Sequence, residues 1–463
     1  MAGKTLATRL AEWVVALDCE ELPPRAVEVA KLLVLDQLGL QVRGASLPAM
    51  QPPRRLVEAM KAAPESTLVA STARTTAPYA AYVNGTLAGS LEFDDAHMSA
   101  WHTGSYVVPA ALAFGELTGA SGRGVITAIA AGAQVMSLLG AETRPNMVHD
   151  GWHGAKILGT FGAAAVAGKL LGLTAEQLAN AFGIAGSDAA GTMEYETSGG
   201  EVKRLHAGSA GRNGSQAALL AKDGFTGPLT IFEGERGLFR LFGNTEDVSG
   251  IDSLWSRFHL VDTMFRLYPV VGTAVPVLEA VRHLVGEAGL RWREIEEMRV
   301  GLPAYAIAHG ASVTRPANTV SAQFSTAFSV ALMLVRGGNR PEDYANPDLW
   351  TDPDLLSIVD RIVPYAEVFE PEEPTLSCRL EVSLKDGRVL SHTQRGFRGH
   401  PSSPDTDDHD LETKFLGNVE GLVSSSAAQK IVELAAGLDQ LGDVGELMRL
   451  TTPAQGPPAE GAV

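Results

Sequence analysis

Residues 151–191, GWHGAKILGTFGAAAVAGKLLGLTAEQLANAFGIAGSDAAG, place apolar side chains at three- and four-residue spacings, with many alanines and glycines among them. This spacing is typical of α-helices, because 3.6 residues complete one turn. Thr174, with Gln177 three residues later, forms the capping-box pattern that begins a helix. The small side chains predict helices that pack closely together, so this stretch indicates a helical bundle.

The helical pattern continues toward the N-terminus. Helices are expected in RAVEVAKLLVLDQLGLQV (25–42), APYAAYVNGTLAGSLEF (77–93) and AALAFGELTG (110–119). The most apolar stretch, Val125 to Ala141, is short for a membrane span and has Arg123 and Glu142 at its ends. We therefore interpret it as a buried helix of the bundle.

After about Phe265 the pattern changes to a mixture of helices and strands. TAVPVLEAVRHLVGEAG (273–289) and SAQFSTAFSVALMLVRGG (321–338) predict helices, whereas IEEMRVGLP (295–303) predicts a strand. CRLEVSLKDGRVLSHTQR (378–395) alternates around KDG and predicts a β-hairpin. From Asp405 the pattern returns to helix.

The predicted fold class is mainly α: a large all-helical domain made from both chain ends, with an inserted smaller α+β lid domain. The predicted boundaries are 1–264 for the first part of the helical domain, 265–396 for the α+β lid and 397–450 for the C-terminal helical part. The last residues, 451–463, are expected to be a disordered tail.

Composition excludes several classes of function. The 463 residues are 45% hydrophobic and carry a formal net charge of −17, which is typical of a globular protein and disfavours nucleic-acid and membrane partners. No dinucleotide-binding glycine motif, P-loop or G-x-S-x-G elbow is present. Two distant cysteines and the absence of a signal-peptide pattern favour a cytoplasmic location.

Three short segments concentrate chemically active side chains. Residues 91–105 (LEFDDAHMSAWHTGS) carry carboxylates beside imidazoles, a combination that serves either metal binding or proton transfer. Spacing alone leaves both readings open, and a surface loop with solvated acids is a third. The candidates in this segment are Glu92, Asp94, Asp95, His97 and His102.

The other two segments are 148–156 (VHDGWHGAK) and 201–208 (EVKRLHAG). His153 lies just before a predicted helix, and helix N-termini attract anions. Around His153, a zinc site is not expected, because it needs three or four converging ligands and the chain has only two cysteines. In the second segment, Lys203, Arg204 and His206 could supply cations for a carboxylate substrate. Adjacent side chains point in different directions, so Lys203 and Arg204 cannot both face one pocket easily and one of them is expected to be structural.

Taken together, these motifs resemble the family of 2-methylcitrate dehydratase and cis-aconitate decarboxylase (MmgE/PrpD). The resemblance is carried, in chain order, by NGTLAGSLEFDDAH with HTGS, GWHGAKILGTFGAAAVAGKLLGL, AEQLANAFGIAGSDAAG, VKRLHAGSAGRNG, DGFTGP and SAQFSTAFSVA, and it covers nearly the whole chain. It implies a homodimer that acts on small di- and tricarboxylates without metal or organic cofactor, at a site between the helical domain and the lid.

The resemblance also implies site residues. The family's acid at the start of its D-F-D-D stretch falls on Glu92, and two histidines and a lysine fall on His102, His153 and Lys203. We therefore predict catalytic roles for these four residues. The predicted substrate-binding residues are Asp94, His97, Arg204, His206, Arg266 and Tyr268.

Three positions depart from the family pattern. Glu92 replaces aspartate and Ala96 replaces a threonine. In the decarboxylase-like pattern, a lysine precedes an aromatic-proline step that is followed by a histidine; FRLYPVVGTA instead places Arg266 before Tyr268 and Pro269, with Val271 at the histidine position. These differences predict a substrate other than cis-aconitate.

The predicted activity is a cofactor-independent lyase that transfers a proton α to a carboxylate, most simply a 2-methylcitrate dehydratase-like hydro-lyase. Three alternatives stay open: an epimerase of a related dicarboxylate such as iminodisuccinate, a cis-aconitate decarboxylase-like enzyme, and an inactive homologue that only binds carboxylates.

Overall fold

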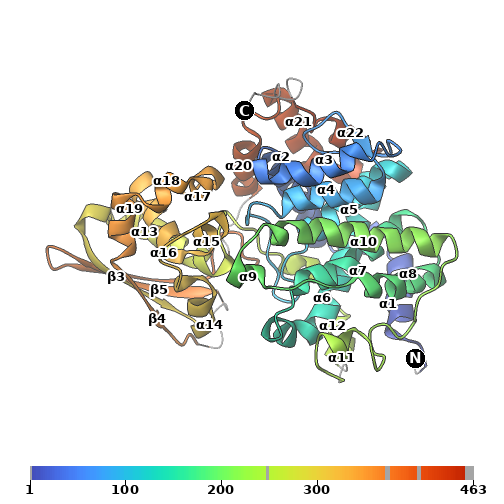
Figure 1. The fold of residues 1–463 in the computed structure, drawn as a ribbon, viewed down its shortest axis with the longest axis horizontal. Coiled ribbons are helices and arrows are strands. Elements are labelled where there is room, and N and C mark those ends of the chain that lie inside the picture. Colours follow the sequence, from blue (N-terminus) through green and yellow to red (C-terminus); the bar gives the residue numbers. More distant parts are fainter. Residues whose placement is uncertain (1–2, 247–249, 371–375, 404–407, 454–463) are drawn as a thin grey trace. The chain divides into compact units, whose positions relative to one another are not determined.

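A computed structural model describes residues 3–246, 250–370, 376–403 and 408–453 (Figure 1). The chain divides into two compact units. The helical unit consists of Met1–Ser90, Asp94–Thr263 and Asp408–Val463, and the second unit consists of Leu91–Phe93 and Met264–Asp407. The second unit thus takes three residues from the segment that precedes His102. Most of the predicted tail, from residue 454 on, lies outside the described residues.

The helical unit is built around long helices with small side chains. α10 (Leu205–Lys222) packs along α7 (Gly154–Leu170), and it also contacts α4 (Ala77–Ala88) and α8 (Ala175–Asp188), as Figure 1 shows. Thr174 accepts from the Gln177 backbone N–H and Gln177 accepts from the Thr174 N–H, so the predicted capping box is confirmed. The remaining helices of its N-terminal part are α1 (Leu6–Ala16), α2 (Pro24–Ala45), α3 (Gln51–Ala59), α5 (Gly104–Thr118), α6 (Gly122–His149), α9 (Tyr195–Ser198), α11 (Leu238–Leu241) and α12 (Gly250–Leu254).

α6 is apolar and long enough, by length and composition, to cross a membrane. Most of its apolar window is nevertheless buried inside the helical unit, where α6 packs against α7 and α5. Its hydrophobicity is therefore explained by packing within this unit, as expected for a core helix.

Both chain ends contribute to the helical unit. α20 (Asp408–Val419) packs on α2, which also contacts α21 (Ser425–Ala436), and α22 (Gly445–Arg449) follows. A buried ion pair joins α20 to α2, because the Lys414 ammonium lies 2.6 Å from a carboxylate oxygen of Asp36. Burial raises the pKa of Asp36 to about 6 even though Lys414 acts in the opposite direction.

The second unit is a small α+β assembly. Its sheet has the strand order β4-β3-β5-β6, formed by β3 (Ile295–Leu302), β4 (Ile362–Ala366), β5 (Ser377–Leu384) and β6 (Val389–Arg395). β3 and β4 are parallel and the other neighbours are antiparallel. β5 and β6 form the predicted hairpin, whose turn places Gly387 at φ +88°. Against β5 and β6 packs α13 (Val275–Ala288).

The predicted single helix over 321–338 is two helices. α15 (Thr319–Phe324) ends and α16 (Thr326–Arg336) begins at Ser325, which is extended, with ψ 104°, and accepts a hydrogen bond from the Phe328 N–H. Serine caps a helix in this way, so the side chain begins a second helix where periodicity alone predicts continuation. The unit also contains the short helices α14 (Ala304–Ala306), α17 (Pro341–Ala345), α18 (Pro347–Trp350) and α19 (Pro353–Val359).

Close packing of α10 against α4 can be tested at two glycines of α10. A Cβ at Gly208 would lie 1.9 Å from the Tyr82 carbonyl oxygen, whereas one at Gly211 would lie 3.4 Å from the Ala81 oxygen. We expect Gly208→Ala to lower the free energy of unfolding by about 1–3 kcal/mol or more through overpacking. Gly211→Ala should be neutral or stabilising by up to about 1 kcal/mol, because alanine favours helix. Urea unfolding of the two variants measures the difference; equal effects would contradict this packing.

Candidate active site

The loop between α4 and α5 is organised by the carboxylate of Asp95. This side chain is fully buried and accepts hydrogen bonds from the Thr103 N–H (2.8 Å), the Thr103 hydroxyl (2.7 Å) and the Gly104 N–H (2.8 Å). It therefore binds the N–H groups at the start of α5, which carry partial positive charge. A Cβ at Gly104 would lie 2.5 Å from Asp95 Oδ1, so glycine permits this close approach.

His102 is oriented by the backbone of the same loop. Its Nδ1 lies 2.7 Å from the Asp95 carbonyl oxygen, and because a carbonyl only accepts, Nδ1 carries the proton. Asp94 Oδ2 is 3.4 Å from the same Nδ1 and accepts from the Ser105 hydroxyl at 2.7 Å. Within the described parts of the chain, Nε2 of His102 has no hydrogen-bond partner. In the neutral ring this atom carries the basic lone pair.

His97, predicted to bind substrate, has a structural role in this arrangement. Its Nε2 lies 3.0 Å from the His259 carbonyl oxygen, and its Nδ1 accepts from the N–H groups of Ser99 and Ala100, both at 3.2 Å. Both ring nitrogens are used within the helical unit and the side chain is buried. Both ring nitrogens thus have partners within this unit, and the substrate-binding role of His97 stays a prediction.

A second group of side chains surrounds a pair of histidines. His153 precedes α7 and His206 lies in the first turn of α10, and their Nδ1 atoms are 2.7 Å apart, so one donates and the other accepts. The Tyr195 ring stands edge-on to both imidazoles, with centroid distances of 5.9 and 5.8 Å. The structure thus brings together two predicted residues that are 53 positions apart in the sequence.

His206 is neutral at pH 7. Burial, followed by the charges of Lys156 and Lys203, lowers its pKa to about 4. The surroundings of His206 therefore oppose its cationic form, and its predicted contact with substrate stays a prediction. The charge at this group comes instead from the lysines.

Lys203 and Arg204 have different surroundings, as their adjacency predicts. Arg204 is buried and its Nε lies 2.8 Å from Glu201 Oε2, an ion pair within one turn. Lys203 is half-buried and its charge acts on His206. We therefore interpret Arg204 as the structural member of the two.

The two groups of the helical unit are linked through Trp101. A Cβ at Gly154 would lie 2.3 Å from the Trp101 ring, so the first residue of α7 packs directly on the residue before His102. Trp101 has φ +61° and forms an isolated bridge with His97. The His102 loop and the segment that carries His153 are therefore neighbours within one unit.

Glu92 and Arg266 are paired within the second unit. Arg266 Nη1 lies 2.9 Å from Glu92 Oε1, and the same nitrogen donates to the Val270 carbonyl oxygen at 2.9 Å. Arg266 is only 1% exposed and Glu92 has φ +53°. The carboxylate of Glu92, predicted to be catalytic, and the guanidinium of Arg266, predicted to bind substrate, are therefore paired with each other. Val271, also buried, occupies the position at which the decarboxylase-like pattern has a histidine.

Tyr268 belongs to another buried cluster of hydrogen-bonded side chains in the second unit. Its hydroxyl donates to Glu279 Oε1 at 2.5 Å, and Arg398 Nε donates to Glu279 Oε2 at 3.0 Å. Burial and the Glu279 carboxylate raise the pKa of Tyr268 above its usual range. The Tyr268 hydroxyl is therefore held by Glu279, and its predicted substrate contact stays a prediction.

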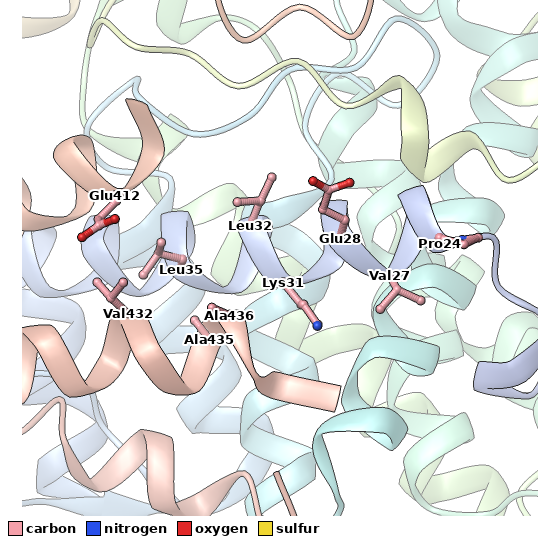
Figure 2. A pocket seen from close by; sticks show the side chains of 10 residues that line it. All are labelled: Pro24, Val27, Glu28, Lys31, Leu32, Leu35, Glu412, Val432, Ala435 and Ala436. Atoms are coloured by element: carbon pink, nitrogen blue, oxygen red, sulfur yellow. The ribbon is translucent and has the colours of Figure 1, made fainter. Parts of the chain in front are cut away.

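Two other features of the chain concern metal and ligand binding. Among the described residues, no three His, Cys, Asp or Glu side chains come together as metal ligands. A groove of about 270 Å³ lies in the helical unit, with Leu32, Leu35 and Val432 among its lining residues (Figure 2). Its charged lining includes the carboxylates of Glu28 and Glu412, and it contains none of the predicted site residues. We therefore place the candidate active site at His102 and the histidine pair.

The lowered pKa of His206 predicts how stability depends on pH. His206 binds a proton near pH 6.5 in the unfolded chain but only near pH 4 in the folded chain. The stability that the neutral imidazole contributes is therefore fully present above pH 6.5 and is lost as the pH falls toward 4. Between pH 7 and pH 5, the free energy of unfolding should fall by about 2 kcal/mol more in the wild type than in His206→Gln. Urea unfolding at both pH values measures this; parallel losses in the two proteins would contradict it.

Comparison with known proteins identifies the family. The MmgE/PrpD N-terminal domain matches residues 8–250, and the MmgE/PrpD C-terminal domain matches residues 268–440. The chain is 27% identical to a cis-aconitate decarboxylase of Aspergillus terreus, over 97% of this chain and 96% of the relative. It is 26% identical to the cis-aconitate decarboxylase of Homo sapiens, over 99% and 96%, and 26% identical to the cis-aconitate decarboxylase-like protein oryM of Aspergillus oryzae, over 96% and 97%. The chain belongs to the MmgE/PrpD family.

Proposed function

We propose that this protein is a cofactor-independent lyase that acts on a small di- or tricarboxylate by proton transfer at the carbon α to a carboxylate. The observation that carries the proposal is His102, whose Nδ1–H is bound by the Asp95 carbonyl while Nε2 has no partner among the described residues. A histidine held in this tautomer acts as a general base through Nε2 and as an acid once it has accepted a proton.

In the proposed reaction, His102 removes the α-proton and the Asp94 carboxylate stabilises the imidazolium that forms. Asp94 suits this role because it lies 3.4 Å from Nδ1 and is itself held by Ser105. Lys203 stabilises the negative charge that develops on the substrate carboxylate. Lys203 or His153 then protonates the leaving group, which requires a second acid beside the base.

Among lyase reactions, we propose elimination of water from a 2-methylcitrate-like hydroxy acid. Elimination needs one base and one acid, and the helical unit contains candidates for both. The names of the relatives favour decarboxylation of cis-aconitate as a second candidate. Against it, Val271 has no proton to give, and Arg266 is paired with Glu92.

The test is proton NMR in D2O of the purified protein with 2-methylcitrate, citrate, cis-aconitate and citramalate. We expect new alkene signals from a hydroxy acid. Release of CO2 from cis-aconitate would replace dehydration with decarboxylation, whereas deuterium exchange with no net loss of water or CO2 would indicate an epimerase. Silence across the panel would contradict the proposed activity.

The role of His102 is tested by substitution. We expect His102→Gln to lower turnover of the substrate found in this panel by about a hundredfold or more, as removal of a general acid–base group does. His149→Gln is the matched control, because His149 is a largely exposed histidine at the end of α6. Its turnover should match that of the wild type, and near-wild-type turnover in His102→Gln would contradict the assignment.

A further inference from the structure

Lys156 lies beside the histidine pair and has no assigned role. It is in the first turn of α7, and its backbone N–H donates to the His153 carbonyl oxygen at 3.0 Å. Its aliphatic stem covers Gly191, where a Cβ would lie 2.8 Å from Lys156 Cδ. In the part of the chain that the structure describes, its ammonium forms neither a hydrogen bond nor an ion pair.

This is an unfavourable position for a cation. The first turn of a helix carries partial positive charge, so a lysine there is repelled by the helix dipole. Burial and the nearby Arg212 guanidinium both lower the pKa of Lys156, and only the exposed Asp188 acts in the opposite direction. Conflicts of this kind between a residue and its surroundings are typical of functional sites.

The placement of Lys156 mirrors that of Lys203. Lys156 follows His153 by three residues, Lys203 precedes His206 by three residues, and the two imidazoles are hydrogen-bonded to each other. The charges of both lysines act on His206. The histidine pair thus has a lysine on each of the two segments that carry it, which suits a ligand with more than one negative group.

We propose that Lys156 is a second carboxylate-binding residue of this site and that it determines specificity for polycarboxylates over monocarboxylates. Lys203 holds one carboxylate of the substrate and Lys156 holds another. The proposal rests on the proposed function for the identity of the ligand as a carboxylate, but it concerns binding rather than the chemical step.

The test is calorimetric titration of the full-length protein with propane-1,2,3-tricarboxylate, which has neither a hydroxyl to eliminate nor a double bond, and with butyrate. Lys156→Met keeps the apolar stem and should weaken tricarboxylate binding about tenfold or more, as loss of a charge-assisted hydrogen bond does. Butyrate binding should change little. Lys156→Arg should retain most of the affinity, and Lys222→Met, at the exposed end of α10, should match the wild type. Unchanged tricarboxylate binding in Lys156→Met, or none in the wild type, would overturn the proposal.

A second measurement does not depend on any ligand. The groups that act on His206 are Lys156, Lys203, His153 and Tyr195. Removing the Lys156 charge should therefore raise the pKa of His206 from about 4 toward its usual value, as measured by NMR of the imidazole. An unchanged value would overturn the placement of the Lys156 ammonium.

The two proposals can fail separately. If the substrate panel stays silent while propane-1,2,3-tricarboxylate binds in a Lys156-dependent manner, the proposed lyase activity fails and the polycarboxylate site stands. If the panel shows turnover while Lys156→Met binds the tricarboxylate as tightly as the wild type does, the lyase activity stands and the role of Lys156 fails.

Discussion

The candidate site depends on the buried residue Asp95. Its carboxylate receives the N–H groups at the start of α5, and its own carbonyl oxygen fixes Nδ1 of His102. One residue thus sets both the start of a core helix and the proton position of the proposed base. A change in the path of this loop would alter the helix and the tautomer together, because both bonds are made by the same residue.

Around the histidine pair of the helical unit, two lysines supply positive charge, whereas His206 is neutral. The imidazoles of His153 and His206 share one hydrogen bond, and burial keeps His206 neutral. Positive charge is supplied by Lys156 and Lys203, and both charges lower the pKa of His206. This arrangement allows an anion to be bound by lysines while an imidazole stays available for proton transfer.

The second unit differs from what the family resemblance alone implies. The predicted acid Glu92 and the predicted cation Arg266 neutralise each other in a buried pair, and Val271 is apolar. Removing one partner of such a pair leaves an uncompensated buried charge, so the two are coupled energetically. Membership of the MmgE/PrpD family therefore does not by itself transfer the activity of the relatives to this chain.

Local signals predicted local structure well. The Thr174 capping box and the hairpin around Gly387 follow from a few neighbouring residues. The break at Ser325 was missed because serine is tolerated within helices, and only the capping hydrogen bond shows that a new helix begins.

The site was predicted only in part, because its contacts join distant residues. Glu92 and Arg266 are 174 positions apart, and no periodicity relates them. His97 and His102 lie in one loop but differ in their hydrogen bonds, since the backbone path decides which ring nitrogens are occupied. Ser105 and Tyr195 were missed, as their chemistry becomes evident only beside Asp94 and the histidine pair. For Lys156, the sequence contained one indication of a role at the site, namely its position one helical turn after His153.

The tautomer of His102 is the most direct test of this account. Long-range proton–nitrogen correlation NMR of protein labelled with ¹⁵N-histidine, with His102→Gln used for assignment, reports which ring nitrogen carries the proton. At pH 8 we expect a protonated Nδ1 and an unprotonated Nε2 for His102, because Nδ1 donates to the Asp95 carbonyl. A proton on Nε2 with a bare Nδ1 would contradict both the geometry of the loop and the proposed base.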